Sequence, residues 1–279
     1  MTSILLIAEP ADAERQSLSR ALMLARYLHA RIDIVFFDSG HPYTQRSFVT
    51  PKATAHRYME ALRNSVTAPD VDITTDAAIA GSLQDTIAQK AAEDGVELVI
   101  KAAGHRRVPS GNHADWQLIS HCPTPLLLTQ GRPWHPRALF AAALDVTDRH
   151  TPNLSFVIAQ ISAQLRIACG ADLILLYAQP ERASSQAMVS EAQAHIRLRQ
   201  LGHENGIEQQ QLRVLDGKAS EILPRFVVEK GLDLIAIGAM DQPSFPQFVG
   251  SLAGQLLRAT DSDLLFVKAA RDSAHTQAE

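Results

Sequence analysis

Cysteine, long apolar runs and runs of basic residues are all scarce in this chain of 279 residues. The two cysteines, Cys122 and Cys169, cannot build a disulfide framework and indicate a reducing compartment. The aliphatic run Ile4–Ala8 has no basic segment before it and stops at Glu9-Pro10, so it is too short for a signal peptide or a membrane span. We therefore expect a cytoplasmic protein without membrane contact.

Charge and motif content exclude further classes. The net charge is −4, and the basic residues form no long run, which disfavours nucleic-acid binding. The chain has no Gly-x-Ser-x-Gly, Gly-x4-Gly-Lys-Ser/Thr, Gly-x-Gly-x2-Gly or His-Glu-x2-His motif at a suitable place. We therefore expect that the protein is not an enzyme. Its 46% hydrophobic and 20% charged residues are typical of a globular protein.

Short aliphatic runs alternate with segments of helical periodicity. Leu18, Ala21, Leu22 and Ala25 form one apolar stripe, whereas Ile32–Phe37 is rich in β-branched and aromatic residues. In the first part of the chain, the predicted strands are 4–8, 32–37, 71–80, 97–101 and 125–129, and the predicted helices are 12–29, 51–66, 83–94 and 112–121.

The same series then recurs. The predicted strands of the second part are 137–144, 172–177, 210–215, 232–237 and 264–267, and its predicted helices are 153–169, 184–204, 219–230 and 250–260. Gly217 follows Gly81 by 136 residues, and Ile235 follows Val99 by 136. So steady an offset indicates an internal duplication. The stiff connection Gly131–Pro136 separates domains at 1–131 and 137–270, and we expect 271–279 to be a disordered tail.

Each half therefore reads as an α/β domain, a doubly wound parallel five-stranded sheet with helices on both faces. Ligands of such sheets bind beyond the carboxyl ends of the strands, where the strand order reverses. We expect any function in the loops that follow the first, third and fourth strands of each half. Pairing segments 125–130 and 263–268 would remove two exposed sheet edges and make an intramolecular pseudo-dimer of the two halves.

The second half carries residues that identify a family. Its first strand ends at Asp145, its third is followed by Gly217, and its fourth ends at Gly238, with Gly250-Ser251 at the next helix start. This arrangement resembles the universal stress protein family, in its tandem-domain, UspE-like type. The resemblance implies a Rossmann-like, HUP-type fold with strand order 3-2-1-4-5 in each half. It also implies nucleotide contacts by Asp145, Gly217, Gly238, Gly250 and Ser251.

The phosphate loop that the resemblance implies, Gly-x2-Gly-x9-Gly-Ser/Thr, is damaged here. Asp241 stands in place of the middle glycine, and Gly250 follows Gly238 by 12 residues where the pattern needs 13. A carboxylate repels a triphosphate, and Pro243 and Pro246 remove two amide donors. In the first half the loop is lost, because Ala102 matches Gly238 and Asn112-His113 match Gly250-Ser251. We expect no cofactor apart from weak ATP binding in the second domain.

Simpler interpretations stay open for each residue. Asp145 fits a residue that caps or orients the next helix, Gly217 and Gly238 fit turn glycines with positive φ, and Ser251 fits an N-cap. Lys218 fits a solvated side chain. No metal site is expected, because His113 and His121 lie about 12 Å apart along a helix, at about 1.5 Å rise per residue. His105, Arg106 and Arg107 fit a solvated loop.

The leading interpretation is a non-enzymatic tandem universal stress protein of the stress response, which binds an unknown small molecule or regulates through a degenerate ATP loop. The alternative is an adenine-nucleotide-binding switch or slow ATPase that uses the second domain. A third possibility is a larger or more apolar ligand in the first half, beside Ala102, Ala103 and Trp116. A further homodimer of the chain is compatible with each of these.

Overall fold

The computed structural model describes residues 2–8, 14–36, 70–76, 87, 89–90, 95–104, 113–147, 153–179, 185–239 and 251–268, without the side chains of 14–15, 76, 113–114 and 185–191. The predicted helix 51–66, most of the predicted helix 83–94, the loop with Asp241, Pro243, Pro246 and Gly250, and the tail 271–279 lie outside these ranges. Within them, no helix is long and apolar enough to cross a membrane.

The first half begins with the predicted alternation. Strand β1 is buried at every position, and the buried Leu18, Ala21, Leu24 and Ala25 turn one stripe of α1 to the sheet. The described elements of this half are β1 (Ser3–Ala8), α1 (Glu14–Leu28), β2 (Arg31–Phe36), β3 (Ile73–Asp76), β4 (Val96–Ala102), α4 (His113–His121) and β5 (Leu126–Thr129).

The second half repeats this series. Helices α5 and α7 are followed by Gly170 and Gly231, whose φ of 60° is the left-handed conformation of a helix C-cap. The elements are β6 (Leu139–Ala143), α5 (Leu154–Cys169), β7 (Asp172–Gln179), α6 (Ser185–Glu204), the 3-10 helix η1 (Gln209–Gln211), β8 (Leu212–Asp216), α7 (Ala219–Lys230), β9 (Leu234–Gly238), α9 (Leu252–Ala259) and β10 (Asp263–Val267).

All ten strands form one sheet in the order β3-β2-β1-β4-β5-β10-β9-β6-β7-β8. Each half thus has the predicted strand order 3-2-1-4-5 with parallel strands, and the two five-stranded sheets are joined into one. Strands β5 and β10 pair antiparallel, with Leu127 opposite Leu265, as predicted for segments 125–130 and 263–268. The sheet is continuous because this pairing satisfies backbone groups that two exposed edges would leave to solvent.

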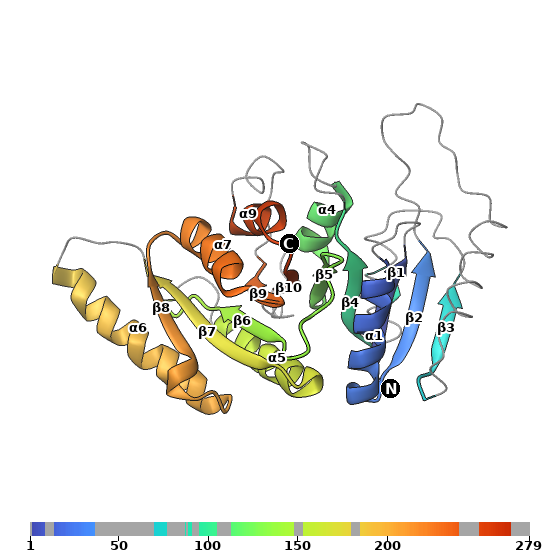
Figure 1. Cartoon of the computed structure of the whole chain (residues 1–279), viewed down its shortest axis with the longest axis horizontal. Helices are drawn as coiled ribbons and strands as arrows, with labels where there is room; N and C mark the ends of the chain where they lie inside the picture. Colours follow the sequence, from blue (N-terminus) through green and yellow to red (C-terminus); the bar gives the residue numbers. More distant parts are fainter. Residues whose placement is uncertain are drawn as a thin grey trace, which may run out of the picture.

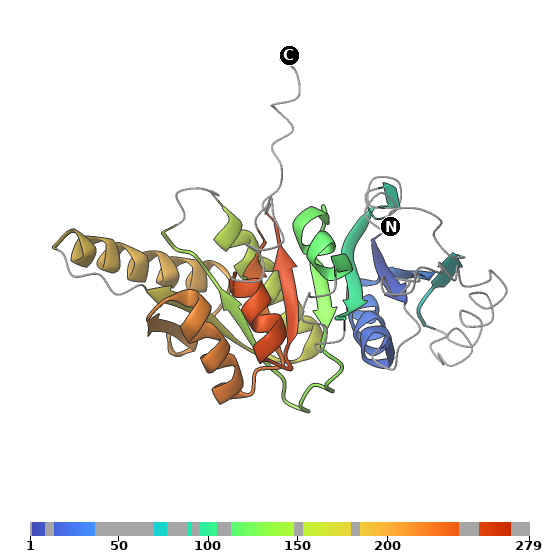
Figure 2. The same ribbon diagram turned by 90° about the horizontal axis from the view of Figure 1, so that it is seen from above.

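Helices cover both faces of the sheet (Figures 1 and 2). Helices α1, α5 and α6 pack on one face, and α4, α7 and α9 pack on the other. Each face has its own apolar core: Leu24, Ile158 and Leu198 belong to the first, and Leu118 and Leu256 to the second. Both cores cross from one half to the other, so the halves fold as one body.

The connection between the halves is held by two buried carboxylates of the second half. Asp233 accepts hydrogen bonds from the backbone of His135 at 3.0 Å and of Leu139 at 2.9 Å. Asp263 accepts from the Gln130 backbone at 2.8 Å, and burial raises the pKa of its carboxyl against the opposing effect of the Arg20 guanidinium. The proline-rich linker is therefore an ordered part of the interface between the halves.

Candidate functional site

The strand order reverses at one place in each half. Strand β6 lies between β9 and β7, with Ala142 opposite Ala236 of β9 and Leu175 of β7. In the first half, β1 lies between β4 and β2 in the same way. The carboxyl ends of β6 and β9 therefore form the natural ligand position of the second half, and those of β1 and β4 that of the first.

Asp145 follows β6 at this position and is exposed. Its carboxylate accepts hydrogen bonds from the Thr147 amide at 3.0 Å and from the Thr147 hydroxyl at 2.7 Å. Its backbone carbonyl accepts a hydrogen bond from the Ser155 hydroxyl of α5 at 2.9 Å. Asn153, not Asp145, occupies the N-cap of α5. The side chain therefore closes a local turn and does not cap the helix, and Asp145 follows the strand that neighbours β9 in the sheet.

Gly217 lies farther from the reversal point, after β8. Its φ of +134° is one that residues with a side chain rarely adopt, and its amide donates to the Gln179 carbonyl at 2.8 Å. The interpretation as a turn glycine is confirmed here. The next residue, Lys218, makes no side-chain cap bond, and its exposed ammonium lies 4.0 Å from Glu221.

Gly238 ends β9 and, unlike Gly217, is needed for close packing and not for a turn. Its φ is not positive, so the interpretation as a turn glycine is wrong for this residue. A Cβ atom here would lie only 2.9 Å from Cδ2 of Leu154 and 3.5 Å from Cδ1 of Ile158. The missing side chain allows the first turn of α5 to pack against the end of β9.

Ser251 begins α9 as its N-cap, which confirms the simpler interpretation. Its hydroxyl oxygen accepts a hydrogen bond from the Gly254 amide at 3.3 Å, and the first turn of α9 holds no acidic residue. The structure thus brings Asp145 and Gly238 together at neighbouring strand ends, while Gly217 lies beyond β7 and Ser251 lies on α9, which packs against α7. Gly250 lies outside the described residues.

The equivalent position of the first half contains a buried ion pair that the sequence reading missed. The ammonium of Lys101, which is fully buried, lies 2.9 Å from Oδ1 of Asp115 and donates to the Ala102 carbonyl at 2.8 Å. Oδ2 of Asp115 accepts from the Gly104 amide at 2.6 Å. A lysine inside the aliphatic strand Val96–Ala102, with an aspartate in the next helix, is the sequence signal for this pair.

Of the histidines considered as metal ligands, the structure describes the side chain of His121 alone. The ring of His121 lies 3.0 Å from the Gln117 carbonyl, while His105 and the side chain of His113 are outside the described part. Among the described residues, no three His, Cys, Asp or Glu side chains gather to hold a metal ion. Burial raises the pKa of the Cys122 thiol and raises that of Cys169 to about 12.

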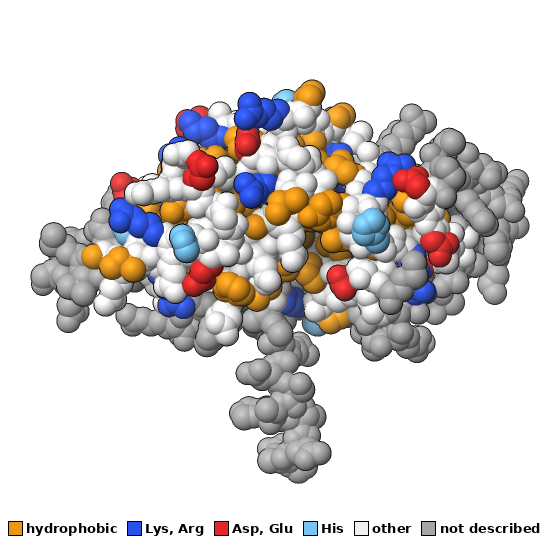
Figure 3. Space-filling model, turned by 90° about the horizontal axis from the view of Figure 1, so that it is seen from below, with side chains coloured by type: hydrophobic (Ala, Val, Ile, Leu, Met, Phe, Trp, Pro, Cys, Tyr) orange, Lys and Arg blue, Asp and Glu red, His pale blue; other side chains and the backbone are white. Residues whose placement is uncertain are grey.

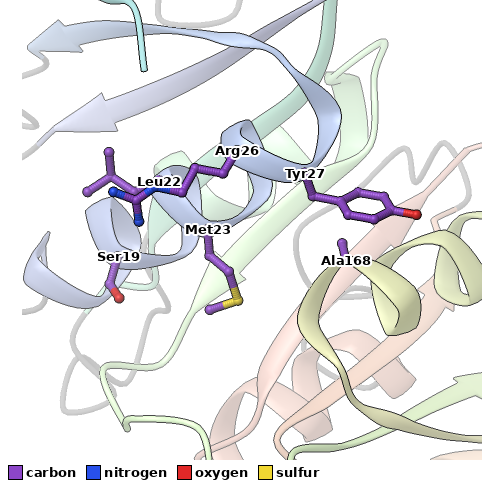
Figure 4. Close-up of a pocket in the computed structure, with 6 residues that line it drawn as sticks. All are labelled: Ser19, Leu22, Met23, Arg26, Tyr27 and Ala168. Carbon is purple, nitrogen blue, oxygen red and sulfur yellow. The ribbon is translucent and has the colours of Figure 1, made fainter. Parts of the chain in front are cut away.

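A shallow pocket of about 600 Å³ opens between α1 and α5, on the face where apolar side chains gather (Figure 3). Tyr27 reaches from the last turn of α1 over Ala168 of the last turn of α5 (Figure 4). Because a crossover helix runs opposite to its strands, these last turns lie toward the amino ends of the strands. The lining residues are Ser19, Leu22, Met23, Arg26, Tyr27 and Ala168. This pocket is therefore separate from the ligand position at the carboxyl ends.

Solved structures of other proteins share this fold over nearly the whole chain. A proposed universal stress protein from Pseudomonas aeruginosa UCBPP-PA14 is 24% identical, with a TM-score of 0.72 over 96% of this chain and 93% of its own. A functionally unknown protein from Pseudomonas aeruginosa PAO1 has the same identity and TM-score, over 96% and 92%. A universal stress protein from Archaeoglobus fulgidus DSM 4304 is 11% identical, with a TM-score of 0.67 over 97% of both chains.

None of the curated proteins compared with the chain matches it. The family model described as Universal stress protein family matches residues 154–268, from the start of α5 to the end of β10. This segment contains Gly217, Gly238 and Ser251, and the structural likenesses extend the same fold over both halves. Residues 154–268 therefore match the universal stress protein family, and both halves of the chain share the fold of these solved structures.

Proposed function

We propose that the protein is a non-enzymatic, UspE-like tandem universal stress protein, which binds a small molecule in its second half and acts in the stress response. The proposal places it in the cytoplasm as an intramolecular pseudo-dimer. The observation that carries it is that Asp145 follows β6 and Gly238 ends the neighbouring strand β9, at the place where the strand order reverses. Such a crevice is the usual ligand position of an open α/β sheet.

The chemistry around this position favours a ligand without a triphosphate. The side chain of Leu154 fills the space beside Gly238. The hydroxyl of Ser251 already accepts a hydrogen bond from the Gly254 amide of its own helix. Asp241 adds a negative charge to the sequence between them, and like charges repel strongly in a partly desolvated crevice. An exposed carboxylate at Asp145 suits a hydroxyl or amino donor on the ligand.

Native mass spectrometry of the full chain, purified without added nucleotide, tests this proposal. We expect one small molecule per chain and its loss in the Asp145→Ala variant. The matched control is Asp216→Ala, which removes an exposed carboxylate at the end of β8. A ligand retained by Asp145→Ala, or lost equally in both variants, would contradict the proposed site.

One observation favours a second candidate, an adenine-nucleotide switch or slow ATPase in the second half. Helix α9 begins without any acidic residue in its first turn, which leaves its positive end compatible with a phosphate. ATP binding or hydrolysis that is lost in Gly250→Glu would favour this candidate. Binding that survives this substitution would exclude the loop before α9 as its site.

A further inference from the structure

The two halves differ in charge at equivalent positions. Lys101 precedes the last residue of β4, and Ile237 precedes the last residue of β9, 136 positions later. Both side chains are buried, but only Lys101 carries a charge. Helix α4 has Asp115 in its first turn, whereas α9 has no acidic residue there. The first half therefore has both a cation and an anion where the second half has neither.

Asp115 makes the contacts expected of a bound anion. One oxygen pairs with the Lys101 ammonium at 2.9 Å, and the other accepts from the Gly104 amide at 2.6 Å, just after β4. A lysine, a backbone amide after a strand and the start of the next helix are the groups that proteins use to bind a phosphate. The side chain of Asp115 is only 7% exposed.

We propose that the carboxylate of Asp115 is a built-in anion, which fills the phosphate position of the first half and closes it to phosphate-bearing ligands. The proposal rests on the proposed function only in treating the ends of β4 and β9 as equivalent ligand positions. Lys101 is then the specificity-determining residue: it keeps the ability to bind an anion, and Asp115 satisfies it from within the chain. The first half can accept a phosphate only when this carboxylate is removed.

Removing Asp115 should therefore create a phosphate site. The full-length Asp115→Ala variant and the unmodified chain are each titrated with inorganic phosphate, at ionic strength held constant with chloride, while the melting temperature is measured. A ligand that binds only the folded state raises this temperature. We expect phosphate to bind Asp115→Ala at least about tenfold more tightly than the unmodified chain, since charge-assisted bonds replace those lost.

Two further variants keep the test decisive. Lys101→Met/Asp115→Ala lacks both charges, and we expect it to lose the gain in phosphate binding. Asp115→Asn keeps an acceptor for the Gly104 amide, and it serves if Asp115→Ala does not fold. We expect Asn at this position to give a smaller gain in the same direction.

Equal phosphate dependence in the unmodified chain and both single variants would overturn the proposal and leave Lys101–Asp115 as a structural ion pair. A gain that persists in Lys101→Met/Asp115→Ala would overturn it too, because the anion would then not use Lys101. This experiment compares phosphate binding between variants at Asp115 in the first half. Its outcome would therefore stay the same if the proposed ligand site beside Asp145 proved wrong.

Discussion

The guanidinium of Arg20 lies 3.0 Å from the carboxylate of Asp263, although 243 residues separate them in the sequence. Both side chains are almost completely buried. Trp134 completes the contact, because its ring lies 3.9 Å beneath the guanidinium and its indole donates to the same carboxylate oxygen at 2.8 Å. Helix α1 of the first half, the linker and β10 of the second half thus meet at one charged cluster.

Arg20→Met should destabilise the whole chain. It leaves the buried carboxylate of Asp263 without its cation, and breaking a buried pair in this way costs about 3–5 kcal/mol. Chemical denaturation measures this loss. Arg20→Met/Asp263→Asn should lose less than the two single variants together, because it leaves no unpaired charge. Additive losses would show that the two side chains do not depend on each other.

Gly217 and Gly238 should respond differently to alanine. Gly217→Ala forces a side chain into φ +134° and should cost about 1–3 kcal/mol through backbone strain. Gly238→Ala instead crowds the flexible end of Leu154, so Leu154→Val should relieve part of its cost. Thermal denaturation of the single and double variants measures both effects. If Leu154→Val restored as much stability to Gly217→Ala as to Gly238→Ala, the two glycines would not differ in the way described.

Ser251→Ala should lower stability by about 1 kcal/mol, because α9 loses the acceptor for its Gly254 amide. Asp145→Asn should change stability by less than about 0.5 kcal/mol, since its side chain is exposed and its described hydrogen bonds lie within its own turn. Urea denaturation compares the two variants. A large loss in Asp145→Asn would assign that residue to the fold and not to ligand binding.

Both cysteines should resist alkylation in the folded protein. Burial raises the pKa of Cys169 to about 12, so its reactive thiolate is scarce at pH 8. We expect iodoacetamide to react with it about a thousandfold more slowly than with an unfolded cysteine. Cys122→Ser isolates this thiol, and Cys169→Ser isolates Cys122. Equal rates in folded and urea-unfolded protein would contradict the burial of Cys122 and the raised pKa of the half-buried Cys169.

The sequence pattern predicted most of the architecture because buried parallel strands leave aliphatic runs and turn glycines at a fixed period. The helix 219–230 agrees with α7 at both ends. Joining of the halves was predictable too, since two unpaired strands at equivalent sheet edges would expose backbone groups. The antiparallel pairing of β5 with β10, with Leu127 opposite Leu265, joins the two five-stranded sheets into one.

The contacts between distant side chains could not be predicted in this way. Gly238 looks like any loop glycine in the sequence, and only the packing of Leu154 against it shows why a side chain is excluded. Lys101 and Asp115 are 14 residues apart, on a strand and a helix whose loop does not fix their contact. The sequence gives the residue types along each strand and helix. The side chains that contact one another depend on how the helices pack on the sheet.

Calorimetric titration of the full chain with Mg-ATP tests most directly the claim that the second half holds a small ligand but no firm triphosphate. We predict no saturable heat until ATP reaches the millimolar range, and the same trace for Gly250→Glu. Binding with a micromolar Kd that Gly250→Glu abolishes would contradict the account and establish the nucleotide switch.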